Sequence, residues 1–303
     1  MPELPDVELY LAALRPRVQG RPIERVRVAS PFFVRTYDPP ADALQGRTIE
    51  SLERIGKRLV FAMDCAQEGN LFIVIHLMIA GRLRWRDRGS PIPAKLGLAA
   101  LDFSHGTLLF TEAGSRKQAS MHVVRGRAAV DAMDPGGADV FALSTEDFGA
   151  ALRSGNHTLK RMLTDPHVFS GIGNAYSDEI LHAARLSPIK LTRALTDEEI
   201  VRLYDATQNV LRDWTARLQE ETGEAFPEKV TAFRPGMAVH GRYGKPCPRC
   251  GAPVQRIVYA RNESNYCANC QTEGRLLADR ALSRLLRDDW PRTLEDLERQ
   301  RRR

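Results

Sequence analysis

Four cysteines near the C-terminal end constrain the fold more than any other feature of this sequence. They form two C-x-x-C pairs separated by residues 251–266, and the four positions are Cys247, Cys250, Cys267 and Cys270. Each pair forms a tight turn, and two such turns can place four thiolates tetrahedrally around one Zn²⁺ ion. A redox-active C-x-x-C motif is the alternative, but two copies at this spacing favour a zinc site. Because all four thiolates would be used, the site would be closed and would stabilise a fold rather than catalyse a reaction.

Length and charge limit the class of protein further. A chain of 303 residues is long enough for two domains of ordinary size. The apolar run at residues 71–80 is about half as long as a bilayer requires, so we expect neither a signal peptide nor a membrane partner. The fifth cysteine, Cys65, belongs to no pair, which together with zinc-type spacing indicates a reducing cytoplasm. The net charge of +6 suits a polyanionic partner.

The first residues after the start combine an amine with an acid. If Met1 is removed, as is usual before a small residue, Pro2 becomes a terminal secondary amine whose pKa lies far below that of a lysine. At neutral pH a useful fraction of this amine is unprotonated and can attack an electrophilic carbon. Glu3 follows directly and can protonate the oxygen of an opening sugar ring. An iminium-forming amine and an acid are the two groups that lyase chemistry at a nucleoside requires.

The pattern of apolar residues changes twice along the chain. A helical period over residues 7–18 is followed by short alternating segments between about 23 and 112, which predict an antiparallel β-sandwich or barrel with one leading helix. Beyond a breaker-rich linker at residues 134–139 the period is helical again, and Thr196 with Glu199 forms a capping-box signature. We therefore expect an α+β multidomain protein with these parts: a β-sandwich domain (1–133), a helical domain (140–234), a zinc finger (235–275), and a C-terminal helix with a basic tail (276–303).

A short glycine motif lies between two of the helical segments. Residues 171–174 read G-I-G-N, and glycines there allow a tight turn whose N–H groups face an anion, with Asn174 as a side-chain donor. This motif alone is weak, but it follows an N-terminal P-E-L-P-D-V-E and precedes a four-cysteine ribbon. The three together, in this order, resemble the formamidopyrimidine-DNA glycosylase/endonuclease VIII family of base-excision-repair enzymes. The likeness extends over nearly the whole chain and suggests a divergent bacterial member.

The resemblance implies a bifunctional DNA glycosylase and AP lyase. Pro2 would attack C1′ of the damaged nucleoside, Glu3 would donate a proton, and the resulting iminium would permit β- and δ-elimination. Asp6 stands where the family usually has Glu, and we expect it to support the terminus by hydrogen bonding. Lys57, in a predicted hairpin turn, matches a family lysine that serves both the catalytic and the DNA-binding set. The partner would be double-stranded DNA with damaged bases or abasic sites, bound by a monomer.

The implied DNA-binding residues come from both halves of the chain. Lys160 and Asn174 belong to a segment that resembles the helix-two-turn-helix module of the family and would hold phosphates beside the lesion. In the family, extrusion of the damaged base requires a pinched DNA backbone, and the resemblance implies that these phosphate ligands pinch it. A single structural Zn²⁺ on the four cysteines is the only implied cofactor.

Three positions depart from the pattern of the family. Residues 76–79 read H-L-M-I where the family has H-L-G-M. The methionine of the family is a wedge residue, which fills the void left by the extruded base; here Ile79 takes its place and Met78 precedes it. The loop at 111–118 contains Arg116 but no aromatic residue, whereas the family has an arginine and a phenylalanine in an R-R-F-G loop. In the finger, Asn262 stands five residues before the third cysteine, where the family has arginine, and Arg261 is its neighbour. Either Asn262 replaces that arginine, or a local bulge allows Arg261 to serve.

Two other classes of function stay open on the sequence alone. A protein that binds damaged DNA without turnover would explain the three departures but not the intact pair of Pro2 and Glu3. A zinc-ribbon protein of RNA or translation would explain the cysteines and the charge but not the N-terminus. We favour the enzyme, acting in the bacterial cytoplasm at the nucleoid.

Overall fold

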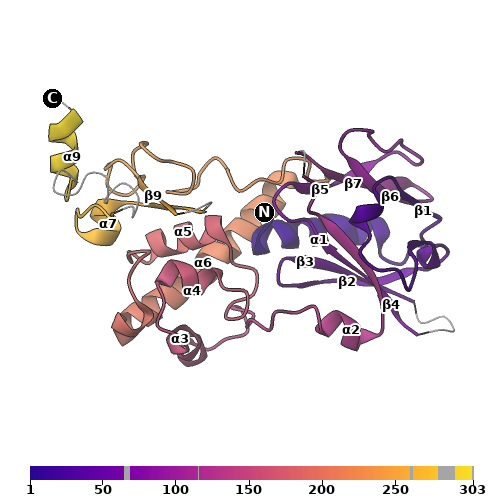
Figure 1. Ribbon diagram of the computed structural model, residues 1–303, viewed down its shortest axis with the longest axis horizontal. Helices are drawn as coiled ribbons and strands as arrows, with labels where there is room; N and C mark the ends of the chain where they lie inside the picture. Colours follow the sequence, from indigo (N-terminus) through magenta and orange to yellow (C-terminus); the bar gives the residue numbers. More distant parts are fainter. Residues whose placement is uncertain (65–68, 115, 260–261, 279–290, 302–303) are drawn as a thin grey trace. The chain divides into compact units, whose positions relative to one another are not determined.

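The protein consists of two compact units, which are drawn in Figure 1. The N-terminal unit contains residues 1–136 and 213–232, and the C-terminal unit contains residues 137–212 and 233–303. The computed structural model describes the whole chain apart from residues 65–68, 115, 260–261, 279–290 and 302–303.

The N-terminal unit is the predicted β-sandwich with a leading helix. Helix α1 (Leu4–Val18) precedes two four-stranded antiparallel sheets. The strands of the first sheet, in spatial order, are β1 (Arg25–Val28), β6 (Gly97–Phe103), β7 (Gly106–Glu112) and β5 (Gly81–Arg86). Those of the second are β2 (Ile49–Ile55), β3 (Arg58–Met63), β4 (Leu71–His76) and β8 (Ser120–Arg125). Shorter elements are η1 (Pro31–Phe33), η2 (Ala41–Leu44) and α2 (Arg127–Asp131).

The strands follow from apolar residues that must be covered on at least one face. Strand β4 is buried at every position except its last, His76, as expected for a central strand rich in Ile, Val and Phe. On the face toward α2, apolar side chains from all four strands of the second sheet pack against Val130 of that helix. Helix α1 is buried around most of its circumference, and Pro5 near its start fits a position where no intrahelical N–H bond is lost.

The segment after helix α6 (Asp197–Thr222) packs on the sandwich. The ring of Phe226 lies 6.1 Å from that of Tyr10 and 6.5 Å from that of Trp85, measured between centroids. The carboxylate of Glu228 accepts hydrogen bonds from the guanidinium groups of Arg84 and Arg86 on β5. Residues 213–232 therefore belong to the N-terminal unit, whereas the sequence placed all of residues 140–234 in one helical domain.

The C-terminal unit is helical around an apolar core and carries the zinc finger, which helix α9 follows in the chain. Its elements in chain order are α3 (Thr145–Arg153), α4 (Leu159–Thr164), α5 (Asn174–Ala183), η3 (Thr192–Ala194), the first part of α6, β9 (Gln255–Tyr259), β10 (Asn262–Tyr266), α7 (Ala268–Thr272) and α9 (Leu294–Arg301). The capping box at the start of α6 is confirmed, because Thr196 Oγ1 accepts the Glu199 N–H and the Glu199 carboxylate accepts the Thr196 N–H. The rings of Phe148, Phe169 and Tyr204 form the aromatic part of the core.

Candidate functional site

The N-terminal acid pair is fixed by the first turn of α1. Glu3 is the N-cap residue, and its backbone N–H donates to Asp6 Oδ2 at 2.9 Å while its own side chain accepts from the Asp6 backbone. Both residues are almost completely buried, at 3% and 1% exposure. A helix N-terminus favours negative charge, so this position holds two carboxylates close to the chain terminus. Asp6 thus makes a supporting hydrogen bond to the backbone of Glu3.

The terminal amine lies among charges of both signs. In this chain the amine belongs to Met1, and the nitrogen of Pro2 is part of a peptide bond. Burial is the main cause that lowers the pKa of this amine; Arg82 and Lys57 lower it further, while Glu3 and Asp6 oppose them. A lowered pKa increases the unprotonated, nucleophilic fraction at neutral pH.

Lys57 lies in the turn between β2 and β3. Ile55 pairs with Arg58, so Gly56 and Lys57 form a two-residue hairpin loop, and Gly56 has the positive φ of +59° that such a loop requires. Burial lowers the pKa of the Lys57 ammonium, and the nearby Glu3 carboxylate opposes that shift. The structure therefore brings Lys57 to the acid pair at the terminus.

Arg82 is a member of this cluster that the sequence did not reveal. It lies on β5, and its guanidinium donates to the carbonyl oxygens of Ile79 at 3.1 Å and Gly81 at 2.6 Å. Its charge also acts on the terminal amine. The only signal in the sequence was the alternation of arginine with apolar residues along β5, which is equally typical of a solvated sheet face.

The predicted wedge is an exposed turn between β4 and β5. The Gly81 N–H donates to the Leu77 carbonyl at 2.9 Å and closes the turn. Met78 has a φ of +52°, a conformation that costs a side-chain-bearing residue about 1–2 kcal/mol. The side chain of Ile79 is 66% exposed. A strained turn that presents a large apolar side chain to solvent is typical of a functional surface rather than of packing.

The second predicted loop is held by a buried carboxylate. Glu112 is 2% exposed and accepts hydrogen bonds from the backbone N–H groups of Gln118 and Ala119. The ammonium of Lys117 donates to the Glu112 carbonyl. Arg116 is exposed and is the basic residue that this loop presents.

Asn174 begins helix α5 of the C-terminal unit. Gly173 precedes it as the N-cap, so the first turn of N–H groups is covered by no capping side chain from that residue. Lys160 of α4 reaches this turn, since its Nζ donates to the Asn174 carbonyl at 2.6 Å. The backbone N–H groups at a helix start of this kind favour an anion.

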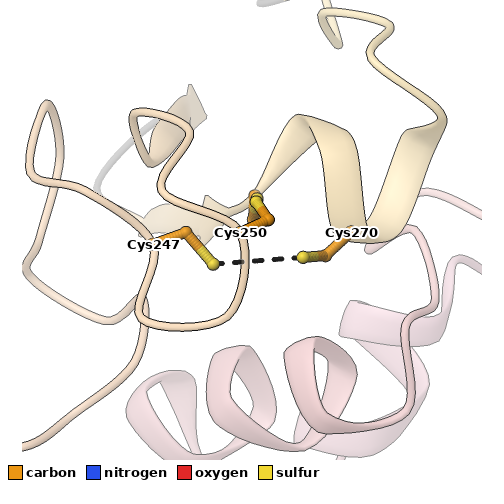
Figure 2. Close-up of side chains that lie close together, drawn as sticks. Cys247, Cys250 and Cys270 are labelled. Atoms are coloured by element: carbon orange, nitrogen blue, oxygen red, sulfur yellow. Dashed lines mark hydrogen bonds between the residues drawn. The ribbon is translucent and has the colours of Figure 1, made fainter.

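The cysteine cluster fits one structural zinc ion. The four sulfur atoms lie within 4.8 Å of one another, with 3.3 Å between Cys250 and Cys267. Figure 2 shows three of the four side chains, with 3.9 Å between the sulfur atoms of Cys247 and Cys270. A tetrahedral ion with Zn–S bonds of about 2.3 Å places its sulfur ligands about 3.8 Å apart, which matches these separations. His182 Nε2 lies 3.2 Å from the sulfur of Cys247 and can support this ligand from the outer shell.

The hairpin of the finger, β9 and β10, includes one of the two candidates for the phosphate contact. Asn262, the first residue of β10, pairs with Tyr259, the last residue of β9. Arg261 lies outside the described residues. The choice between these two for a phosphate contact therefore stays a prediction.

Comparison with known proteins gives a family match for three segments of the chain. The formamidopyrimidine-DNA glycosylase N-terminal domain matches residues 1–121, the H2TH domain of the same enzyme matches residues 136–223, and the zinc finger found in FPG and IleRS matches residues 244–272. The formamidopyrimidine-DNA glycosylase of Thermus thermophilus is 33% identical over 287 residues, which cover 90% of this chain and 100% of the relative. The chain belongs to the formamidopyrimidine-DNA glycosylase family.

Solved structures of this family agree with the fold. A mutant Lactococcus lactis enzyme in complex with DNA containing Fapy-dG has a TM-score of 0.77 and 25% identity, and it covers 89% of this chain and 100% of its own. The wild-type Lactococcus lactis enzyme with DNA containing an oxidized pyrimidine gives the same values. No helix within the described part of the chain is both long and apolar enough to cross a membrane.

The half-buried His76, the last residue of β4, makes the stability of the protein depend on pH. Burial, then Arg58, Lys57 and His122, lower the pKa of His76 to about 4. In the unfolded chain this histidine titrates near its ordinary value of about 6.5, so only the unfolded state binds a proton between these values. Stability is therefore lost as the pH falls from about 6.5 toward 4.

We expect His76 to account for about 1–2 kcal/mol of the unfolding free energy lost between pH 7.5 and pH 5. Denaturant unfolding at both pH values should show this loss in the wild type and a smaller loss in His76→Gln. The exposed His105→Gln variant is the matched control. An identical pH dependence in wild type and His76→Gln would contradict the assignment.

Proposed function

We propose that this protein excises damaged bases from double-stranded DNA and cleaves the strand at the resulting abasic site. The observation that carries the proposal is the cluster at the terminus, in which two buried carboxylates, Lys57 and Arg82 surround the α-amine. The relatives point to the same substrate, because they are named formamidopyrimidine-DNA glycosylases and one was solved with Fapy-dG DNA.

The proposed reaction begins once Met1 is removed. The lone pair of the Pro2 nitrogen attacks C1′ of the damaged nucleoside, and the C1′–N bond breaks as the base leaves with its electron pair and takes up a proton. Glu3 donates a proton to the ring oxygen, so that the sugar opens and an iminium links the protein to C1′. The iminium acidifies the C2′ proton. Removal of this C2′ proton expels the 3′ phosphate, and a second elimination expels the 5′ phosphate.

DNA contacts would come from both units. Lys57 and Asn174 are the proposed phosphate ligands, and Lys160 stands beside Asn174. Ile79, preceded by Met78, would fill the space that the extruded base leaves, and Arg116 would face the opposite strand. Asn262 or Arg261 would add a contact from the finger. Phosphate contacts position such a protein on the duplex, while the pocket selects the lesion.

We also propose that the protein acts as a monomer on the chromosome in the bacterial cytoplasm. A second candidate, a protein that binds damaged DNA without turnover, is favoured by Ile79 in the wedge and by Asn262 in the finger. It does not explain why Glu3 and Asp6 are buried at the terminus.

Borohydride trapping tests the proposal. Intact-mass measurement should show a chain without Met1, and borohydride should reduce the iminium to a stable covalent complex with a duplex that contains an abasic site. A two-residue extension ahead of Pro2 turns the amine into an amide and should lower trapping by at least about 100-fold, whereas the same extension at the C-terminus should leave it unchanged. Retention of Met1, or no trapped complex with the wild type, would exclude the lyase.

A further inference from the structure

Lys160 is held by groups of its own unit. Its side chain is only 15% exposed, and its Nζ donates to the carboxylate of Asp178 at 2.5 Å as well as to the Asn174 carbonyl. A lysine has three N–H donors, so two of the three are engaged inside the protein. The next residue, Arg161, is exposed and is the cation that this turn of α4 presents to solvent.

Asp178 is the centre of this arrangement. Its side chain is fully buried. Four side chains from distant parts of the C-terminal unit donate hydrogen bonds to its carboxylate. Oδ1 receives Lys160 Nζ and the Ser264 hydroxyl at 3.2 Å, while Oδ2 lies 2.8 Å from His240 Nδ1 and 3.3 Å from Asn265 Nδ2. One carboxylate thus connects α4, α5, the segment around His240 and strand β10.

A buried charge of this kind requires its partner. An unpaired carboxylate inside a protein is strongly destabilising, and so is the removal of one member of a buried ion pair. The ammonium of Lys160 supplies the opposite charge, and the hydrogen bonds from Ser264, Asn265 and His240 occupy the other lone pairs. The pair is therefore neutral as a whole and adds no net positive charge to the start of α5.

We infer that Lys160 is a positioning residue and not a phosphate ligand, and that Asp178 holds it in place. Lys160 fixes the carbonyl of Asn174, and through it the first turn of α5, while Asp178 ties the same turn to strand β10 of the finger. This inference rests on the proposed function only in that Asn174 is taken to contact DNA. It changes the role that the resemblance gave to Lys160.

Salt dependence separates the two roles. Each phosphate contact by a lysine releases counterions and contributes about 0.9 to the slope of log K against log salt. The double variant Lys160→Met/Asp178→Asn removes the pair and leaves the net charge of the protein unchanged. With a duplex that contains a tetrahydrofuran abasic-site analogue, we expect its slope to equal that of the wild type. Lys57→Met, which removes a proposed phosphate ligand, should lower the slope by about 0.9.

Combination with Asn174→Ala tests whether Lys160 acts through Asn174. Both the double variant and Asn174→Ala should weaken binding, by about tenfold each, and the triple variant should be no weaker than Asn174→Ala alone, because the two changes remove the same contact. Zinc content and thermal midpoint show whether each variant is folded. A slope reduced by about 0.9 in the double variant, or fully additive losses in the triple variant, would overturn the inference.

Lysine footprinting of the unmodified protein gives a second test that requires no variant. The acylation rate of Lys160, followed by mass spectrometry, should be low and should not change when the same duplex is added. Protection of Lys160 by DNA would overturn the inference even if the variants fail to fold. A wild-type protein that does not bind this duplex at all would instead refute the proposed function.

Discussion

Glu3→Gln should abolish base excision and leave the lyase step at a ready-made abasic site largely intact. With a nucleoside substrate the sugar ring is closed, and in the proposed reaction a proton must reach the ring oxygen as the Pro2 amine attacks. Glutamine cannot supply that proton, and loss of a positioned general acid typically costs about 10²–10⁴-fold in rate. An abasic site already exists partly as an open-chain aldehyde, so its reaction with the amine does not depend on this proton. Gel assays of base excision and of borohydride trapping measure the two steps separately.

Two comparisons make this prediction specific to the acid. Glu8→Gln alters a carboxylate of the same helix that pairs with Arg54 at 2.8 Å, and it should change neither step by more than about threefold. Glu3 is also the N-cap of α1, and loss of a cap costs about 1 kcal/mol, so the thermal midpoint of Glu3→Gln must be measured beside its activity. An equal loss of excision and trapping, with a lowered midpoint, would show that Glu3 serves the fold and not the chemistry.

The parts of the fold that the sequence predicted depend on neighbours in the chain. Strands such as 49–55 and 71–76 were recognised from alternation and from β-branched residues, and the start of α6 was recognised from the reciprocal bonds of Thr196 and Glu199. Each of these signals comes from residues less than ten positions apart. The zinc site was recognised from a longer pattern, two C-x-x-C pairs separated by residues 251–266, but this pattern too is a fixed spacing along the chain.

The features that escaped prediction depend on residues that are far apart in the sequence. Asp178 lies inside the G-I-G-N-A-Y-S-D-E motif, but its donors come from positions 160, 240, 264 and 265, and no local pattern identifies them. Arg82 joins the terminus only because β5 passes beside α1. Likewise, residues 213–232 belong to the N-terminal unit because Phe226 and Glu228 find partners on β5 and α1.

The finger has too little apolar material to be stable without its metal. Its core cluster consists of five buried residues, of which two, Cys247 and Cys267, are themselves proposed ligands. An isolated two-stranded hairpin such as β9–β10 is at best marginally stable in water. Zinc binding supplies about 10–16 kcal/mol to small sites of this kind, so the metal provides much of the folding free energy of the finger.

Zinc removal should therefore lower the affinity for abasic duplex by at least about 100-fold, the second large effect that we expect. Strand β10 carries Ser264 and Asn265, which bind Asp178, so a loosened hairpin also releases the turn that holds Asn174. The metal-free protein, or Cys267→Ser, should show fast amide exchange in β9 and β10 with unchanged exchange in the sandwich strands. Cys65→Ser, outside the two pairs, is the matched control and should keep one zinc ion and full affinity. Normal DNA binding by a metal-free chain would contradict a structural zinc and would favour redox chemistry for the cysteine pairs.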